Sequence, residues 1–292
     1  MIRLSVIGVG LIGGSLGLAL KKNFGEDIHI LGYGRNRANL DAAVKLGAID
    51  EIAPNLQIAA KADVIYLATP ILQMVPIIKN LLPHIAPETI ITDCGSTKGE
   101  IFSAVKQILP KNVYFIAGHP MTGREKSGVT AAKANLFENK MYVIIKDEDT
   151  PNEIYDRLMR LLVKTGAKFT YLPIAAHDGA ASVISHLPHI AAAAMVHLLE
   201  ESPHEEVAKN LIGGGFRDTT RIASSNADMW ADILMTNSSH IVRNIDDYIG
   251  ILQKIKAAIM SKDRTAAHSF FSESKSARDA LLLETEPKFD AN

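Results

Sequence analysis

Residues 1–23, MIRLSVIGVGLIGGSLGLALKKN, contain the stretch that decides the fold of this chain. A short apolar run comes before the glycines, and residues 13–23 continue after them with helical spacing. Between the two, Gly8, Gly10 and Gly13 form the pattern G-x-G-x-x-G. A glycine loop between a strand and a helix is typical of dinucleotide-binding units, because it brings a pyrophosphate close to the amides of the helix N-terminus.

Each position in this loop has its own expected role. Gly8 permits the tight turn, Gly10 lets the backbone approach a pyrophosphate, and Gly13 allows close contact between helix and strand. Leu11 and Ile12 lie between these glycines and are also expected to contact the cofactor. The N-terminus of the helix that follows offers free N–H groups and a dipole that favour a phosphate. We therefore expect the loop to hold a dinucleotide, and the alternative is a glycine-rich turn that binds nothing.

The rest of the first half alternates between strands and helices. Strands are expected at 2–9, 28–34, 63–70, 89–96, 113–120, 141–148 and 168–172. Helices are expected between most of them, at 36–46, 71–82, 97–109 and 151–165. Short apolar strands that alternate with helices indicate a parallel sheet covered on both faces. We therefore predict a Rossmann-type, doubly wound α/β domain over residues 1–173.

The second half contains no further strand pattern after residue 174 and reads as helices, with breaks near residues 202, 213–215 and 261. Apolar side chains recur there at three- and four-residue spacing, at Ile241, Ile245, Tyr248, Ile249, Leu252 and Ile255. The small alanines at 191–194 let helices approach closely. We predict an all-helical domain over residues 174–292 that forms a homodimer, with packing inside one subunit as the alternative.

The composition fits a cytoplasmic, soluble protein. A formal net charge of −1 provides no attraction to nucleic acid or to a membrane surface, so we expect neither partner. The single cysteine, Cys94, excludes an intrachain disulfide and fits a reducing compartment. Glycines interrupt the apolar N-terminus, unlike a signal peptide. The apolar stretch 190–199 is shorter than a bilayer span.

The end of the second expected strand bears on the choice of cofactor. An NAD site usually carries an acidic residue about 20 residues after the glycine loop, where it binds the ribose hydroxyls. This position falls on Tyr33-Gly34-Arg35, and GYGRNR contains no carboxylate. Gly34 removes the charge that would repel a 2′-phosphate, and Arg35 or Arg37 can pair with that phosphate. We therefore favour NADP over NAD. The alternative is that both arginines are solvated and NAD binds.

Polar residues follow two further expected strands. Ser96 and Lys98 lie just beyond one, and His119 lies just beyond the next. Ligands of open α/β sheets bind at the carboxyl ends of the strands, so chemistry is expected here. A histidine in a glycine-flanked loop can accept a proton near neutral pH, with a structural hydrogen bond as the alternative. Cys94 is expected to pack rather than react.

The helical half adds a second polar group of residues. His186 and His189 lie three apart on one face, and Asp218 and Arg221 have the same spacing further on. Arg221 can clamp a carboxylate through two hydrogen bonds, and a local pair with Asp218 is compatible with that role. The sequence has no H-E-x-x-H motif and no cysteine cluster, so we expect no metal site.

Five motifs occur in order: GVGLIGGS, DCGSTKG, GHPMTGREKSG, SHLPH and GGGFRDTTRIASSNADMW. In this combination the chain resembles the prephenate/arogenate dehydrogenase family of tyrosine biosynthesis over nearly its whole length. The resemblance implies a Rossmann domain joined to a helical dimerisation domain. It also implies oxidative decarboxylation of prephenate to 4-hydroxyphenylpyruvate, or of arogenate to tyrosine, with hydride transfer to NAD(P).

The resemblance further implies roles for individual residues. His119 would accept the hydrogen bond and proton of the substrate's C4 hydroxyl, Ser96 would orient the reacting groups, and Arg221 would hold a substrate carboxylate. The other expected substrate contacts are His186, His189, Asp218, Arg124, Glu125 and Trp230, the last with core packing as its alternative. Besides the loop and the residues after the second strand, Thr69, Pro70 and Ser96 are expected to contact the cofactor.

Some points stay open. Arg124 stands where a threonine is common in the family, so the choice between prephenate and arogenate is not decided. A β-hydroxyacid dehydrogenase is the competing enzyme class, but that class uses a lysine at the start of its helical domain and residues 174–189 contain none. A dinucleotide-sensing regulator without catalysis is the alternative outside the enzymes.

Overall fold

The structure is a computed structural model that describes residues 1–124 and 126–285. The chain divides into two compact units, Met1–Ile241 and Val242–Asn292. The first unit holds all the strands and the helices up to α11, and the second holds most of α12 and all of α13.

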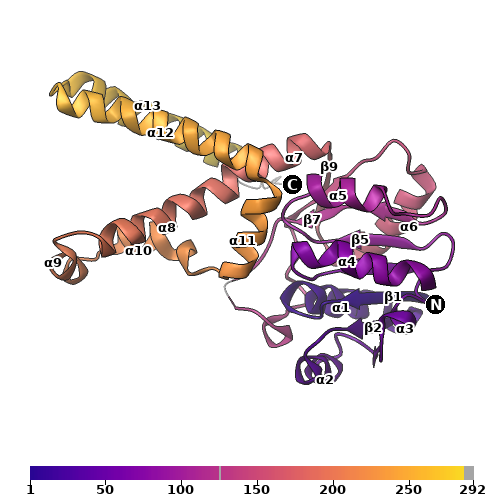
Figure 1. Ribbon diagram of the computed structural model, residues 1–292. Coiled ribbons are helices and arrows are strands. Elements are labelled where there is room, and N and C mark those ends of the chain that lie inside the picture. The colour runs from indigo at the N-terminus through magenta and orange to yellow at the C-terminus, as the bar shows by residue number, and fades with distance from the viewer. Residues whose placement is uncertain (125, 286–292) are drawn as a thin grey trace, which may run out of the picture. The chain divides into compact units, whose positions relative to one another are not determined.

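Six parallel strands form the main sheet of the first unit (Figure 1). From one edge to the other they are β3 (Glu51–Ile52), β2 (Ile28–Tyr33), β1 (Ile2–Ile7), β4 (Val64–Leu67), β5 (Ile90–Asp93) and β6 (Tyr114–Ile116). The order reverses between β1 and β4, and the crevice beyond such a reversal is where open α/β sheets bind ligands. The predicted Rossmann-type fold is confirmed.

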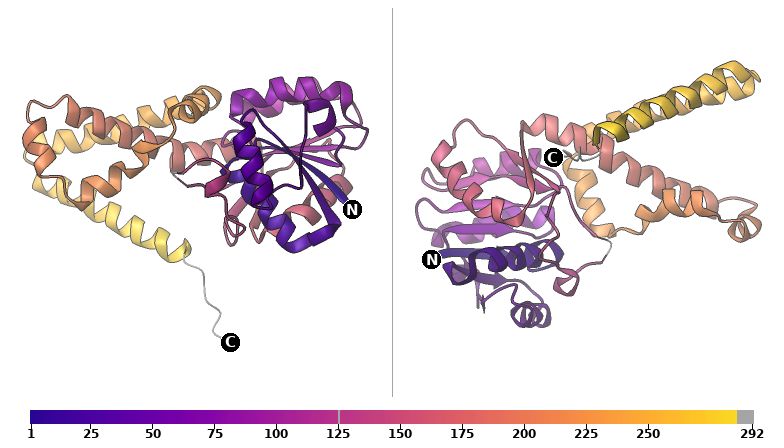
Figure 2. Two further views of the ribbon diagram at one scale, coloured as in Figure 1. Left: turned by 90° about the horizontal axis from the view of Figure 1, so that it is seen from below. Right: turned by 180° about the vertical axis from the view of Figure 1, so that it is seen from behind.

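Helices cover both faces of this sheet (Figure 2). They are α1 (Leu11–Phe24), α2 (Arg37–Lys45), α3 (Leu56–Ala59), α4 (Ile71–Leu81), α5 (Gly99–Lys106) and α6 (Asn152–Leu162). The helices α1 and α6 contribute to one apolar core, and α3, α4 and α5 contribute to the other. Short 3₁₀ turns lie at η1 (Gly25–Asp27), η2 (Leu82–His84), η3 (Val129–Ala131) and η4 (Val163–Thr165). Apolar burial on both sides of the strands holds the carboxyl edge of the sheet in place.

A second, three-stranded sheet was not expected from the sequence. Its strands are β7 (Gly118–Pro120), β8 (Met141–Ile145) and β9 (Lys168–Leu172), with β7 antiparallel and β9 parallel to β8. The expectation of one continuous strand over 113–120 was therefore wrong, because the segment divides into β6 and β7. The expected strands 141–148 and 168–172 exist, but they belong to this second sheet.

The division between β6 and β7 has a local cause at Gly118. The N–H of Gly118 donates to Oδ1 of Asp93 at 3.1 Å, and its carbonyl accepts from Nζ of Lys98 at 2.7 Å. Its peptide groups are thus bonded to a buried ion pair and not to a neighbouring strand of the main sheet. A Cβ at Gly118 would lie 2.8 Å from the ring of Tyr142, so a larger residue would not fit.

The helical half of the first unit begins with a continuous run that contains a π-helical turn. The run comprises α7 (Ile174–Ala181), η5 (Ser182–His186) and α8 (Leu187–Glu200). In η5 the N–H of Leu187 reaches the carbonyl of Ser182, and Pro188 follows without an N–H. The remaining elements are α9 (Glu205–Asn210), α10 (Gly214–Thr220), η6 (Arg221–Ser224), α11 (Ala227–Thr236) and the start of α12 (Ser238–Met260).

This helical run is longer than the apolar stretch 190–199. The helix Ile174–Glu200 has 27 residues and contains an 18-residue window with a mean hydropathy of 1.4. Its length and composition alone would allow it to cross a membrane. The stretch 190–199 is the later part of this longer helix, because α7 and η5 extend it toward the N-terminus. The added turns carry the buried polar residues His177, Asp178 and His186.

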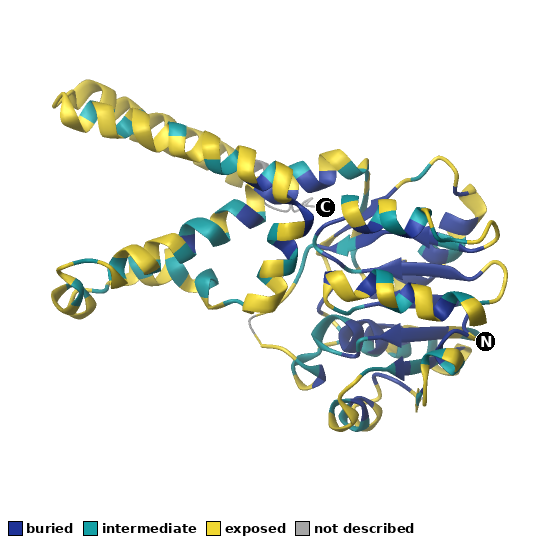
Figure 3. Cartoon of the chain, in the orientation of Figure 1, coloured by how far each residue is buried: buried dark blue, intermediate teal, exposed yellow. Residues whose placement is uncertain are grey.

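The second unit consists of long helices with little burial (Figure 3). It contains the larger part of α12 and the helix α13 (Arg264–Thr285). Many of its apolar side chains are exposed within the single chain, among them Ile249, Leu252, Ile259 and Phe271. The helical nature of this half is confirmed, and its apolar positions are not covered by the subunit itself.

Candidate functional site

The glycine loop has the geometry of a phosphate cradle. Gly8 has φ +94°, and a Cβ there would lie 2.4 Å from the carbonyl oxygen of Ala68. A Cβ on Gly13 would lie 2.4 Å from the carbonyl oxygen of Gly8. These two glycines are therefore required by the protein's own packing.

Gly10 differs from its neighbours because no atom of the described chain lies within 4 Å of the position of its absent Cβ. It is the N-cap of α1 and provides no side-chain cap. The first amides of α1, at Leu11, Ile12 and Gly13, have no acceptor within the helix. Open space beside free amides at the N-terminus of a 14-residue helix fits a pyrophosphate, so the residues suit the dinucleotide that the sequence predicts.

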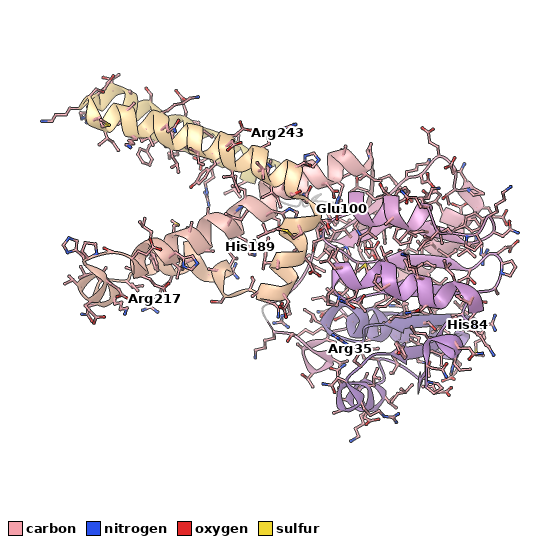
Figure 4. The ribbon with its side chains drawn as sticks, in the orientation of Figure 1. Arg35, His84, Glu100, His189, Arg217 and Arg243 are labelled. Carbon is pink, nitrogen blue, oxygen red and sulfur yellow. The ribbon has the colours of Figure 1, made fainter. Side chains whose placement is uncertain are left out.

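The residues after β2 lie beside this cradle. Nothing in the backbone requires glycine at Gly34, since a Cβ there would meet only Leu40 at 3.7 Å. Arg35 is exposed at the carboxyl edge of the sheet (Figure 4). Arg37 is also exposed, and its Nε donates to Asp41 at 3.0 Å. The site therefore has two surface cations and no carboxylate at the position after the strand.

A polar residue that was not predicted braces this region. The side chain of Asn39 donates to the carbonyl of Val9 at 2.6 Å and accepts from the N–H of Val129 at 3.0 Å. It thereby joins α2 to the glycine loop and to η3. An asparagine inside a helix has no distinctive sequence signal, so only the fold identifies it.

On the other side of the cradle, Thr69 and Pro70 follow β4. A Cβ on Gly8 would lie 3.0 Å from Cγ2 of Thr69, so Thr69 packs directly against the loop. Its hydroxyl is buried without a hydrogen-bond partner in the described part of the chain. Pro70 is the N-cap of α4, and the half-buried Ser96 lies in the loop between β5 and α5.

A buried ion pair lies under the carboxyl end of β5. Nζ of Lys98 is 2.5 Å from Oδ2 of Asp93, and both side chains are almost completely buried. The same carboxylate accepts the N–H of Gly95 at 2.8 Å and that of Gly118 at 3.1 Å. The pair fixes the backbone directly before His119, so it sets the position of that side chain.

His119 is half-buried at the centre of β7 and contacts α7. Its Nδ1 lies 2.8 Å from Nε2 of His177, whose Nδ1 lies 2.8 Å from Oδ1 of Asp178. Burial lowers the pKa of His119 well below its usual value, and the charge of Lys98 lowers it further. His119 is therefore neutral at neutral pH, as a proton acceptor must be.

A cluster of rings lies at the start of α8. His189 stacks on Trp230 of α11 with ring centroids 4.0 Å apart, and His186 meets the same ring edge-on at 5.9 Å. Burial lowers the pKa of His186 to about 4. Burial and the charge of Arg221 lower the pKa of His189, although its hydrogen bond to the carbonyl of Ser185 acts in the opposite direction.

Two buried donors in this cluster have no partner in the described chain. They are Nε1 of Trp230 and Nε2 of His186. Nδ1 of His186 lies 3.2 Å from the side-chain amide of Asn237, which donates to it. Since Nδ1 accepts, the proton of the neutral ring is on Nε2. The core-packing alternative for Trp230 does not explain an indole N–H without an acceptor.

The remaining predicted residues lie at the surface of the single chain. Arg221 begins η6 and is near enough to lower the pKa of His189, and Asp218 is exposed on α10. Arg124 is exposed after β7, while Glu125 lies outside the described residues. The structure thus brings His186, His189 and Trp230 together in the ring cluster and places His119 in β7. Among the described residues, the side chains of Asp218 and Arg124 take part in no hydrogen bond or ion pair.

His177, Asp178 and Asn237 were not expected from the sequence to belong to the site. The dipeptide His-Asp in IAAHDGAA was a possible signal, because two adjacent polar residues interrupt an otherwise apolar helix. Cys94 is not a nucleophile, since burial raises the pKa of its thiol to about 12. Among residues 1–124 and 126–285, no three His, Cys, Asp or Glu side chains are grouped to hold a metal ion.

Comparisons with known proteins identify the family of this chain. Residues 16–171 match the prephenate dehydrogenase nucleotide-binding domain, and residues 173–273 match the prephenate dehydrogenase dimerization domain. The prephenate dehydrogenase of Bacillus subtilis is 40% identical over 279 residues, which are 94% of this chain and 75% of that protein. The crystal structure of prephenate dehydrogenase from A. aeolicus with hydroxyphenyl propionate and NAD+ has a TM-score of 0.89 at 31% identity, covering 96% of this chain and 98% of that one. Synechocystis arogenate dehydrogenase has a TM-score of 0.82 at 30% identity, covering 96% and 100%. The chain belongs to the prephenate dehydrogenase family.

Proposed function

We propose that this protein oxidatively decarboxylates prephenate, arogenate or both, in the synthesis of tyrosine. The observation that carries the proposal is the neutral His119 at the carboxyl edge of a dinucleotide-binding sheet, next to a ring cluster with unpaired donors. Membership of the family supports it, and relatives named for prephenate and for arogenate leave the substrate open between the two. The neutral His119 and the buried polar groups beside it favour catalysis over a sensing regulator.

In this proposal a dinucleotide held by the loop of Gly8, Gly10 and Gly13 would supply the acceptor for the hydride that leaves C4 of the substrate. The substrate ring loses CO2 and becomes aromatic. His119 accepts the hydrogen bond of the C4 hydroxyl and takes its proton as C4 loses the hydride, then returns that proton to the phenolate oxygen. Ser96 orients the hydroxyl or His119. These residues position groups and hold one proton, because aromatisation itself drives the reaction.

The other residues bind the substrate in this proposal. Arg221 holds a carboxylate, and the N–H groups of His186 and Trp230 are unpaired donors that can bind a polar substrate. His189 is neutral and stacks on Trp230, so it forms an uncharged wall. Asp218 orients Arg221 or shapes the site, and Arg124 and Glu125 are the remaining proposed substrate contacts.

We also propose that residues 1–173 bind the dinucleotide and that residues 174–292 form a homodimer. Support comes from the match to a dimerization domain and from exposed apolar side chains in both units. In the first unit they include Val183, Ile184, Met195 and Leu198, and in the second they include Ile249 and Leu252. A second subunit that covers these apolar side chains removes the need for a membrane to cover them. Together with the single cysteine, this favours a cytoplasmic protein without a membrane or nucleic-acid partner.

For the cofactor we propose NADP over NAD. The A. aeolicus relative was crystallised with NAD+, but here the residue after β2 is Gly34, and neither backbone conformation nor packing requires a glycine there. Glycine at position 34 leaves space beside Arg35 and places no negative charge there. A 2′-phosphate is the ligand group that such a position favours.

Gly34→Asp is expected to lower the kcat/KM ratio of NADP over NAD by about 10- to 100-fold, since it places a carboxylate where the phosphate would lie. Steady-state kinetics with both cofactors measures the ratio. Gly34→Ala is the matched control, because it fills the same space without charge and should leave the ratio nearly unchanged. Equal effects of the two variants would contradict an electrostatic role for this position.

Arg221→Ala is expected to raise the substrate KM by about 10- to 100-fold with a smaller change in kcat, because a lost charge-assisted clamp weakens substrate binding. Arg217→Ala, one turn earlier and exposed on α10 (Figure 4), is the matched control and should leave KM within about twofold. If both variants have the KM of the parent, Arg221 does not hold the substrate.

The experiment that tests the function is an assay of the purified protein with prephenate and arogenate, each with NAD and with NADP. Reduced nicotinamide is followed by absorbance, and the aromatic product is identified by chromatography. Turnover of either substrate supports the proposal. Cofactor binding without turnover of either one would favour the sensing regulator.

A further inference from the structure

Behind His119 lies a chain of buried side chains that no expectation from the sequence included. It runs from Nδ1 of His119 to His177 and on to the carboxylate of Asp178, with both distances at 2.8 Å. His177 and Asp178 are 2% and 4% exposed, so water does not compete for these hydrogen bonds. The chain links β7 to α7 within the first unit.

The direction of every hydrogen bond in this chain follows from Asp178. Its Oδ1 accepts the N–H of Lys98 at 2.9 Å, and its Oδ2 accepts the N–H of Gly99 at 2.8 Å. Burial alone would raise the pKa of this carboxyl, but the hydrogen bonds from His177 and these amides lower it below its usual value. Asp178 is thus a carboxylate at the N-terminus of α5, and it can only accept.

The states of the two histidines then follow in order. Because Asp178 accepts, Nδ1 of His177 carries the proton and donates it. In the neutral ring, Nε2 of His177 has a lone pair, so Nδ1 of His119 must be the donor to it. Nε2 of His119 is left with a lone pair and no proton. That nitrogen is the atom which can accept from a substrate hydroxyl.

We infer that His177 and Asp178 are a positioning pair that holds His119 as the Nδ1–H tautomer and stabilises the charge that it gains. The inference rests on the proposed role of His119 as proton acceptor. When a hydroxyl proton binds Nε2 of His119, the proton on Nδ1 is drawn toward Nε2 of His177, and the positive charge faces the Asp178 carboxylate. Return of the proton to the product oxygen reverses these shifts.

Other charged or titratable groups near His119 oppose its protonation. They are Lys98 beside β7 and His186 in η5, together with His177 itself. Lys98 is already paired with Asp93, while the carboxylate of Asp178 is in contact with the histidine chain. Asp178 is therefore the anion that offsets the positive charge at His119.

The first test is Asp178→Asn, which keeps the shape but removes the charge and places a donor where only acceptors fit. We expect kcat to fall by about 10²-fold or more. The acid limb of the pH profile, where kcat/KM falls as His119 becomes protonated, should move to lower pH. The reason is that His119 loses the anion that favours its protonated form. Thr236→Val is the matched control, since it removes a buried 2.7 Å hydrogen bond to Thr97 without touching the chain. It should leave the acid limb in place.

A second pair of variants leaves the amides of α5 untouched. Gln in place of His177 can still accept from Nδ1 of His119, whereas Leu cannot. We expect His177→Gln to retain at least about tenfold more kcat than His177→Leu. Long-range ¹H–¹⁵N NMR of histidine-labelled protein reports the tautomer directly, and should find Nδ1–H at His119 in the parent and in His177→Gln but not in His177→Leu.

The inference is overturned if His177→Leu keeps both the parent kcat and the Nδ1–H tautomer of His119. It is also overturned if Asp178→Asn loses kcat with an unmoved acid limb and an unchanged tautomer, since that result indicates a purely structural role. The proposed function fails separately, if a variant without His119 still turns over substrate. The NMR readout needs no turnover, so the two failures are distinguishable.

Discussion

His119→Asn is expected to lower kcat by about 10³-fold, within the range for loss of a positioned general base. Asparagine has a side-chain amide near the position of Nδ1, so it can keep the hydrogen bond to His177 while it lacks any group at the position of Nε2. The substitution therefore removes proton acceptance and little else. The Kd for the cofactor should stay within about twofold, because the glycine loop does not depend on this side chain.

The pH profile of the parent enzyme gives a second check on His119. Burial and Lys98 lower the pKa of His119 well below its usual value of 6.5. A base must be unprotonated to act, so kcat/KM is lost only as the pH falls through this lowered pKa. The acid limb of kcat/KM should thus lie below pH 6.5, with a flat region above it.

His84→Asn is the matched control for this variant. His84 is an exposed histidine in η2, and it lies at the opposite edge of the sheet from Arg35 (Figure 4). It should leave kcat and the acid limb unchanged. If His119→Asn has about the kcat of the parent, His119 is not the proton acceptor, regardless of how tightly the variant binds the cofactor.

The sequence predicted the parts of the site that local pattern determines. Gly8 and Gly10 fall in the expected turn and Gly13 lies in the first turn of α1, and of these three glycines only Gly10 faces open space. His119 lies just after the carboxyl end of β6, in β7 of the second sheet. Its place near this end of the main sheet was expected, because parallel strands bring their carboxyl ends together. These features depend on a few residues in one segment, so a single sequence reveals them.

The features that the sequence did not reveal depend on contacts between distant segments. The second sheet exists because Asp93 and Lys98 bond the peptide groups of Gly118, 25 and 20 residues away. His177 and Asp178 become functional candidates only when α7 lies against β7 and the start of α5. A His-Asp pair in a helix does not by itself predict this role, because the role depends on contacts with His119 and with the amides of Lys98 and Gly99.

Lys98→Met is expected to lower the free energy of unfolding by about 3–5 kcal/mol, the range for removing one partner of a buried ion pair. Lys98 is 1% exposed, so neither it nor Asp93 has access to water. Methionine fills a similar volume but leaves the Asp93 carboxylate with only the amides of Gly95 and Gly118. A urea titration followed by tryptophan fluorescence and by circular dichroism measures the change.

Two further variants show why burial decides this effect. Arg3→Ala breaks an ion pair at 2.8 Å with Asp63, but that arginine is 56% exposed, so the cost should be below about 1 kcal/mol. Lys98→Met combined with Asp93→Asn should recover part of the lost stability, because it removes the uncompensated charge as well as its partner. If Lys98→Met costs no more than Arg3→Ala, the pair does not hold β5 to β7, and the fixed position of His119 must have another origin.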